Sequence, residues 1–146
     1  MTINRLFLDA NILFSIGYGS PALDRLRDLA REKRCLLFAS RYVIEEAQRN
    51  LLNPEHLKKL EMFLSTAHIV PEVDPEIPCP IDLPAKDRPV LLASISCKAH
   101  YLLTGDITHF GQYFGKTING VRICRPRDYF LEKKMRRGKN KKGAKR

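Results

Sequence analysis

The chain has 146 residues, 44 % of them hydrophobic, which fits one globular domain with a core of its own. No apolar run approaches the roughly 18–20 residues of a membrane span, and the N-terminus lacks the pattern of a secretory signal, so we expect a cytoplasmic protein with no membrane partner. The four cysteines form no CxxC pair, which argues against a zinc ribbon or a disulfide framework.

The net charge of +10 is unevenly distributed along the chain. Residues 132–146 hold nine Lys/Arg and one Glu, a net charge of +8, which leaves +2 for residues 1–131. We therefore predict one domain over residues 1–131 and a basic, disordered tail over residues 132–146. A basic tail is attracted to polyanions, so Lys139, Lys141 and Lys142 are candidate RNA-binding residues. A tail that only improves solubility is the alternative.

Short apolar runs alternate with helical patterns along the predicted domain. The strands are expected at 5–8, 36–39, 68–70, 100–104 and 121–124. The helices are expected at 21–33, 41–52, 54–67, 87–99 and from about 126 onward. Five prolines between residues 71 and 84 exclude regular structure and predict a loop. Asn119 and Gly120 fit either a tight hairpin turn or a plain loop.

This alternation predicts the fold class and the position of a ligand site. Parallel neighbouring strands need crossover helices, so we expect an α/β protein with a parallel sheet of about five strands between two helical layers, a three-layer α/β/α sandwich. In such sheets, ligands bind beyond the carboxyl ends of the strands.

Acidic residues from four distant segments are expected at that edge. Asp9 follows the first strand and Asp106 the fourth; Glu45 and Glu46 lie one turn into the helix after the second strand, and Asp87 begins the helix before the fourth. Two bare charges about 4 Å apart repel by on the order of 4 kcal/mol at an effective dielectric near 20. A divalent cation turns this repulsion into binding, and carboxylate oxygens suit Mg²⁺ or Mn²⁺.

Each acid taken alone has a simpler interpretation. An aspartate that precedes a helix caps exposed backbone amides, and capping is the favoured interpretation for Asp87 and an equal alternative for Asp106. Glu46 alone reads as a solvated helix residue, and one of the adjacent pair Glu45 and Glu46 must point outward. The coincidence of four acids at one sheet edge favours the metal site.

Three stretches, "LFLDANILFS", "SRYVIEEAQRNL" and "DRPVLLASISCKAHYLLTGDITHF", resemble the successive motifs of the PIN-domain nucleases, which include the VapC-type toxins. The resemblance covers most of residues 5–130. In that family a serine, five residues and a glutamate mark the second acid, which selects Glu46 over Glu45 when counted from Ser40. The D-x-P-V-L pattern selects Asp87, and the T-x-D turn selects Asp106.

The resemblance implies a Mg²⁺- or Mn²⁺-dependent endoribonuclease with the catalytic, metal-binding quartet Asp9, Glu46, Asp87 and Asp106. Glu46 would either bind metal or orient the attacking water. Asn11 and Thr104 would support the metal ligands or their waters. The family also implies a toxin-like role, a cognate antitoxin that covers the acidic site, and a homodimer.

Substrate RNA must be held by cations, because the expected catalytic edge is negative. Candidates near the site acids are Arg41, Arg49, Lys86 and Arg88, of which Arg41 and Arg88 are favoured; a surface ion pair is the alternative for each. His109 either meets phosphate or shapes the turn, and we favour the turn.

Three alternative functions remain open. The first is an RNA-processing or ribosome-associated enzyme, which the lysine-rich tail favours. The second is a non-catalytic RNA-binding module, which lost acids would favour, and none is lost. The third is a phosphatase of the haloacid dehalogenase type, which places a second Asp where this chain has Asn11.

Overall fold

The structure is a computed structural model that describes residues 3–134. A six-stranded sheet runs through the molecule in the order β3-β2-β1-β4-β6-β5. All adjacent strands are parallel except β5 and β6, which are antiparallel. The strands are β1 (Asn4–Leu8), β2 (Cys35–Ser40), β3 (Ala67–Val70), β4 (Tyr101–Leu103), β5 (Thr117–Ile118) and β6 (Val121–Cys124).

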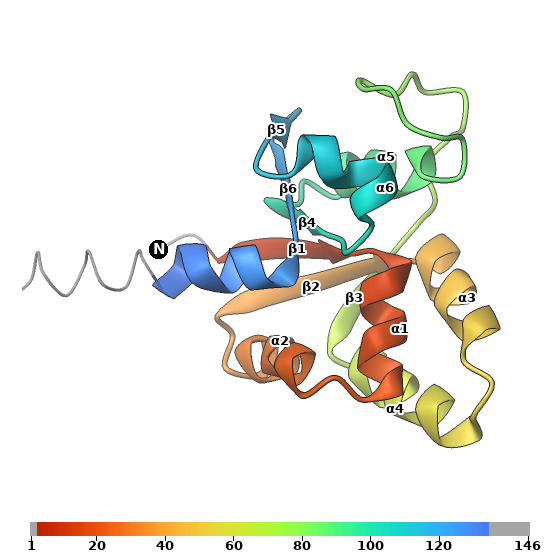
Figure 1. Cartoon of the computed structure of the whole chain (residues 1–146), viewed down its shortest axis with the longest axis vertical. Helices are drawn as coiled ribbons and strands as arrows, with labels where there is room; N and C mark the ends of the chain where they lie inside the picture. The colour runs from red at the N-terminus through yellow and green to blue at the C-terminus, as the bar shows by residue number, and fades with distance from the viewer. Residues whose placement is uncertain (1–2, 135–146) are drawn as a thin grey trace, which may run out of the picture.

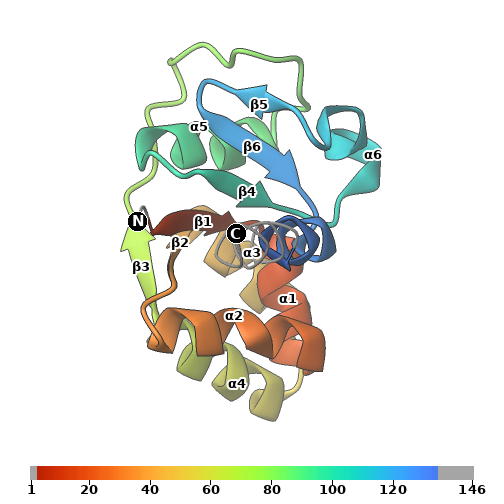
Figure 2. The same ribbon diagram turned by 90° about the vertical axis from the view of Figure 1, so that its left-hand side faces the viewer.

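Helices cover both faces of the sheet, which confirms the predicted three-layer α/β/α sandwich. In Figures 1 and 2, α1, α2 and α4 lie below β1, whereas α5 and α6 lie above it. The helices are α1 (Ala10–Tyr18), α2 (Pro21–Arg31), α3 (Arg41–Asn50), α4 (Pro54–Leu64), α5 (Arg88–Ser96), α6 (Ile107–Phe110), the short 3₁₀ helix η1 (Gly111–Tyr113) and a last helix over residues 126–134. Within residues 3–134, no helix is both long and apolar enough to cross a membrane.

Helix α1 begins directly after Asp9 and was not among the expected elements. Its sequence ANILFSIGY is apolar on most sides, and it packs among α2, α3 and α4 rather than along one face of the protein. Gly17 permits the close approach to α4, because a Cβ atom there would lie 3.1 Å from the carbonyl oxygen of His56 and 2.7 Å from Leu51 Cδ1. A helix buried on several sides carries no amphipathic signal for sequence analysis to detect.

The hairpin interpretation of Asn119 and Gly120 is confirmed. Their φ angles of 47° and 88° are the two left-handed values that a tight two-residue turn requires, and Ile118 pairs with Val121 across it. The sheet therefore gains a short antiparallel edge strand beyond the five that were expected. With two residues, β5 is too short to give a detectable alternation.

The last helix packs against the sheet through Tyr129, which is fully buried and meets the ring of Tyr101 edge to face at 4.9 Å. Glu132 accepts a hydrogen bond from the Tyr101 hydroxyl and forms an ion pair with Arg122 at 2.7 Å. The described part of this helix therefore extends three residues past the predicted domain boundary at residue 131. The tail residues Lys139, Lys141 and Lys142 lie outside the described residues.

Candidate metal centre

A cleft of about 650 Å³ opens at the carboxyl edge of the sheet, where ligands bind in parallel α/β proteins. It is bordered by the start of α1, by α3, by the segment that leads into α5 and by the turn after β4. All four predicted acids line this cleft, together with other polar residues. The main polar lining residues are Asp9, Asn11, Glu46, Asn50, Lys86, Asp87 and Asp106.

Asp9 lies at the end of β1 and is only 5 % exposed. Its Oδ1 accepts a hydrogen bond from the Ala10 amide at 2.7 Å, which caps α1. Burial raises the pKa of Asp9 from 3.8 to about 6, the hydrogen bonds from Thr104 and Ala10 oppose the rise, and the charges of Glu46 and Asp87 add to it. Asp9 is therefore costly to ionise unless a cation approaches it.

Asn11 and Thr104 hold the second oxygen of Asp9 in place. The Thr104 hydroxyl donates to Asp9 Oδ2 at 2.8 Å, and Asn11 Nδ2 donates to the same atom at 3.1 Å. Asn11 Oδ1 also accepts from the Gly105 amide at 2.7 Å, so one side chain joins the ends of β1 and β4. The predicted role of both residues in supporting metal ligands stays a prediction.

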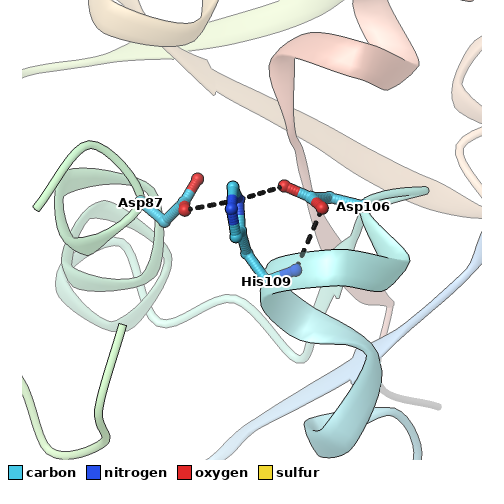
Figure 3. Close-up of side chains that lie close together, drawn as sticks. All are labelled: Asp87, Asp106 and His109. Carbon is cyan, nitrogen blue, oxygen red and sulfur yellow. Dashed lines mark hydrogen bonds and ion pairs between the residues drawn. The ribbon is translucent and has the colours of Figure 1, made fainter. Parts of the chain in front are cut away.

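Asp106 and Asp87 face each other across His109, as Figure 3 shows. Asp106 Oδ1 caps α6 by accepting from the His109 amide at 3.1 Å, and its Oδ2 lies 2.9 Å from His109 Nδ1. Asp87 Oδ2 lies 3.0 Å from the same nitrogen. One imidazole nitrogen is thus enclosed by two carboxylates from segments nineteen residues apart.

The capping interpretation of Asp87 is wrong. Asp87 occupies the position before α5, but its side chain makes no capping hydrogen bond and turns toward His109 instead. The residue is 7 % exposed, and burial is the main reason that its pKa is raised; the charge of His109 opposes the rise. For Asp9 and Asp106, capping and cleft lining occur together.

Glu46 lies on α3 and lines the cleft, whereas Glu45 is exposed and is not among its lining residues. The charge of Glu46 contributes to the raised pKa of both Asp9 and Asp87. The member of the pair that faces the other acids is therefore the one selected by counting from Ser40. The catalytic and metal-binding roles of the quartet remain predictions.

Two tyrosine hydroxyls anchor the proline-rich loop that ends at Asp87. Tyr42 on α3 donates to the carbonyl of Lys86 at 2.7 Å, and Tyr113 donates to the carbonyl of Asp82 at 3.0 Å. Arg88 Nε adds a hydrogen bond to the Leu83 carbonyl at 3.0 Å. Sequence analysis missed this anchoring, because it depends on which carbonyls the fold brings within reach of each hydroxyl.

The basic residue that lines the cleft is Lys86. Arg41, Arg49 and Arg88 are exposed and are not among the lining residues, and Arg88 is partly engaged by its own loop. The predicted preference for Arg41 and Arg88 is untested by this placement. Of the four described candidates, Lys86 alone lines the cleft.

The residues present fit a divalent cation. Ligand atoms of Asp87, Asp106 and His109 all lie within 4.8 Å of one another. Asp87 Oδ2 is buried and accepts no hydrogen bond, and its neighbour His109 Nδ1 at 3.0 Å compensates its charge only when the imidazole is protonated, so a cation here would stabilise it. Carboxylates from Asp9 and Glu46 border the same cleft and add oxygen donors.

The fold and the cleft define an α/β protein with a carboxylate-lined site at the carboxyl edge of its sheet. No known family model matches the sequence, and no curated protein matches it. The fold is similar to that of a chain in the crystal structure of VapBC2 from Rickettsia felis bound to a DNA fragment from their promoter. The TM-score is 0.58 at 18 % identity, over 83 % of this chain and 98 % of that chain.

Proposed function

We propose that the protein is a PIN-type, metal-dependent endoribonuclease that hydrolyses RNA phosphodiester bonds. The observation that carries this proposal is the cleft at the carboxyl edge of the sheet, which gathers four carboxylates from four segments, two of them buried. Burying acids close together lowers the stability of the fold, and a bound cation would offset this cost by neutralising their charges. Further support comes from the resemblance of the sequence motifs to those of PIN nucleases.

The roles of the residues follow from their positions. Asp9, Asp87 and Asp106 would hold Mg²⁺ or Mn²⁺, which when bound neutralises charge on the phosphate and makes water nucleophilic. Thr104 and Asn11 fix Asp9 Oδ2 by hydrogen bonds, so the carboxylate keeps one orientation. Glu46, which lines the cleft from α3, would bind the cation or orient the attacking water. Lys86 offers a positive charge to a phosphate oxygen.

The proposed setting is a cytoplasmic toxin-antitoxin pair. The structural neighbour is a VapBC2 complex, and a toxin of this type would bind an antitoxin that covers its acidic site and would form a homodimer. The lysine-rich tail favours a second candidate, an RNA-processing or ribosome-associated enzyme with the same chemistry, because nine Lys/Arg in fifteen residues attract structured RNA.

The test is cleavage of a labelled RNA pool by purified protein with Mg²⁺, Mn²⁺ or EDTA, with Asp106→Asn beside the wild type. We expect cutting that requires metal and that the variant loses by at least about 100-fold. Asp74→Asn, in the exposed proline-rich loop, is the control and should cut normally. RNA that is bound but never cut would instead favour the non-catalytic binding module.

A further inference from the structure

We propose that His109 is a ligand of the cation at this site, so that one nitrogen joins the carboxylate oxygens and the site prefers Mn²⁺ to Mg²⁺. This inference rests on the proposed metal-dependent function and adds to it a residue outside the four acids. It concerns the cluster of Asp87, Asp106 and His109 drawn in Figure 3.

The distances around His109 match those between neighbouring ligands of one octahedral ion. With metal–ligand distances of about 2.1 Å, two ligands at right angles lie about 3.0 Å apart. His109 Nδ1 lies 2.9 Å from Asp106 Oδ2 and 3.0 Å from Asp87 Oδ2. Small shifts of these three side chains would therefore bring all three atoms to ligand distance of a single cation.

The hydrogen bonds of the cluster leave one buried oxygen unsatisfied. Nδ1 carries at most one hydrogen, so it can donate to only one of the two carboxylates at a time. Asp87 Oδ2, on a residue that is 7 % exposed, keeps no hydrogen bond. A cation among the three groups would satisfy both carboxylates and the nitrogen lone pair at once, which the single hydrogen cannot do.

The backbone also fixes His109 for this role. His109 lies in α6, three residues after Asp106, which caps this helix, and its amide donates to Asp106 Oδ1 at 3.1 Å, so ring and carboxylate move together. The ring is 26 % exposed, which leaves Nε2 able to carry the imidazole hydrogen while Nδ1 presents its lone pair. The cap residue and the helix residue three positions later are then fixed relative to each other.

The chemical consequence is a change of metal preference. Mg²⁺ binds oxygen donors almost exclusively, whereas the transition-metal ions accept imidazole nitrogen. A site made of the four acids alone would serve Mg²⁺ and Mn²⁺ with little distinction. A site that includes His109 holds Mn²⁺ more tightly, since only Mn²⁺ gains from the nitrogen.

The experiment measures metal binding directly on the full chain. Mn²⁺ and Mg²⁺ affinities are determined by calorimetry, and electron spin echo modulation of bound Mn²⁺ reports any nitrogen ligand. His109→Asn keeps an oxygen one bond beyond Cγ, where histidine has Nδ1, and His109→Leu keeps bulk without a donor. His68→Asn, at an exposed position of β3, is the control. Thermal unfolding of each variant checks that it folds.

In the wild type we expect ¹⁴N modulation and tighter binding of Mn²⁺ than of Mg²⁺. His109→Leu should weaken Mn²⁺ binding by more than about tenfold, the lower end of what losing an outer partner of a ligand costs. His109→Asn should lose the ¹⁴N signal and the Mn²⁺ preference but retain binding of both ions, and His68→Asn should match the wild type.

Three negative results have different meanings. Wild-type protein that binds Mn²⁺ without ¹⁴N modulation, with His109→Asn unchanged or tighter, would overturn the role of His109 and leave the proposed nuclease standing. Tighter binding in His109→Leu would identify the ring as a group that competes with the cation for the carboxylates. If the wild type binds neither Mn²⁺ nor Mg²⁺, or binds them with the same affinity as Asp9→Asn, both proposals are overturned together.

Discussion

At the scale of single residues, the carboxylate of Asp9 is the group whose environment departs most from that of a surface acid. It follows a strand whose last three residues are buried, yet its pKa of about 6 means that near neutral pH most molecules carry the charge in a site that disfavours it. Such a residue lowers the stability of the metal-free protein. We interpret this cost as the consequence of a site organised for a cation.

The pH dependence of folding should reveal this cost. The folded-state pKa of Asp9 lies above the unfolded value of 3.8, so the native protein retains the proton between pH 3.8 and about 6, and unfolding releases it. The free energy of unfolding therefore falls as the pH rises through that window. The loss amounts to about 3 kcal/mol at pH 7, at about 1.4 kcal/mol per pKa unit.

Asp9→Asn isolates this contribution from that of other acids. Relative to the wild type, the variant should gain about 2.4 kcal/mol of stability as the pH rises from 4 to 7, because part of the loss has already occurred at pH 4. The measurement is urea unfolding in EDTA across this range. Any constant offset from altered hydrogen bonds cancels, because the slope with pH is compared. Parallel curves for the two proteins would contradict the shifted pKa.

Thr104 is the residue on which the polar network depends. Its hydroxyl donates to Asp9 and accepts from the Asp106 amide and from Asn11 Nδ2, and the side chain is fully buried. Thr104→Val keeps the shape and leaves these groups unsatisfied. We expect a loss of about 2 kcal/mol in urea unfolding, within the usual cost of a buried unsatisfied group.

The matched variant Thr117→Val tests whether the loss comes from the network. Thr117 lies exposed on β5, so the same substitution there should change the free energy of unfolding by less than about 0.5 kcal/mol. Thr104→Val should also raise the pKa of Asp9 further, because the hydrogen bond from Thr104 holds it down. If the pKa of Asp9 stays unchanged in an NMR titration that follows its carboxyl carbon, the loss of stability in Thr104→Val comes from packing.

At the scale of elements, the sheet was largely predictable because its strands are short apolar runs bounded by turns and prolines. Asp9 and Asp106 could be assigned to one edge because the carboxyl ends of parallel strands meet there. The position of His109 between two acids could not be predicted, because it depends on how α5 and α6 pack. Local sequence also favoured the wrong role for Asp87, since a residue before a helix usually caps it.

The hydrogen bonds that hold the proline-rich loop before Asp87 give a prediction at this scale. Tyr42→Phe and Tyr113→Phe each remove one hydrogen bond to a loop carbonyl, at 2.7 and 3.0 Å. Because water can reach both carbonyls, each change should cost less than about 1 kcal/mol in stability. Amide hydrogen exchange over residues 82–87 should nevertheless become faster, and Mn²⁺ binding should weaken severalfold as Asp87 loses its fixed position.

Tyr18→Phe is the control for this pair, because Tyr18 is exposed on α1 and away from the loop. It should leave both the exchange rates and the affinity for Mn²⁺ unchanged. Slow exchange in the double variant Tyr42→Phe with Tyr113→Phe would mean that the prolines and the buried Leu83 fix the loop without the tyrosines.

At the scale of the whole molecule, the protein separates its charges. The cleft gathers acids and one lysine, whereas the excess of positive charge belongs to residues 132–146. An acidic cleft repels RNA until a cation occupies it, and exposed charges act over only about 8 Å at physiological salt. Affinity for RNA and cleavage of RNA should therefore depend on different parts of the chain.

Deletion of residues 138–146 tests this separation. The deletion removes five Lys/Arg, so the slope of log affinity for single-stranded RNA against log salt should flatten by up to about 3.5, at roughly 0.7 per phosphate contact. Affinity should fall most at low salt, and Mn²⁺ binding should not change. A tail of equal length with Asn at these five positions should behave like the deletion, and full-length Asp106→Asn should bind RNA as the wild type does. Equal RNA affinity of deleted and full-length protein at both low and high salt would mean that the tail serves solubility alone, and that the cleft holds its substrate through Lys86 and the bound cation.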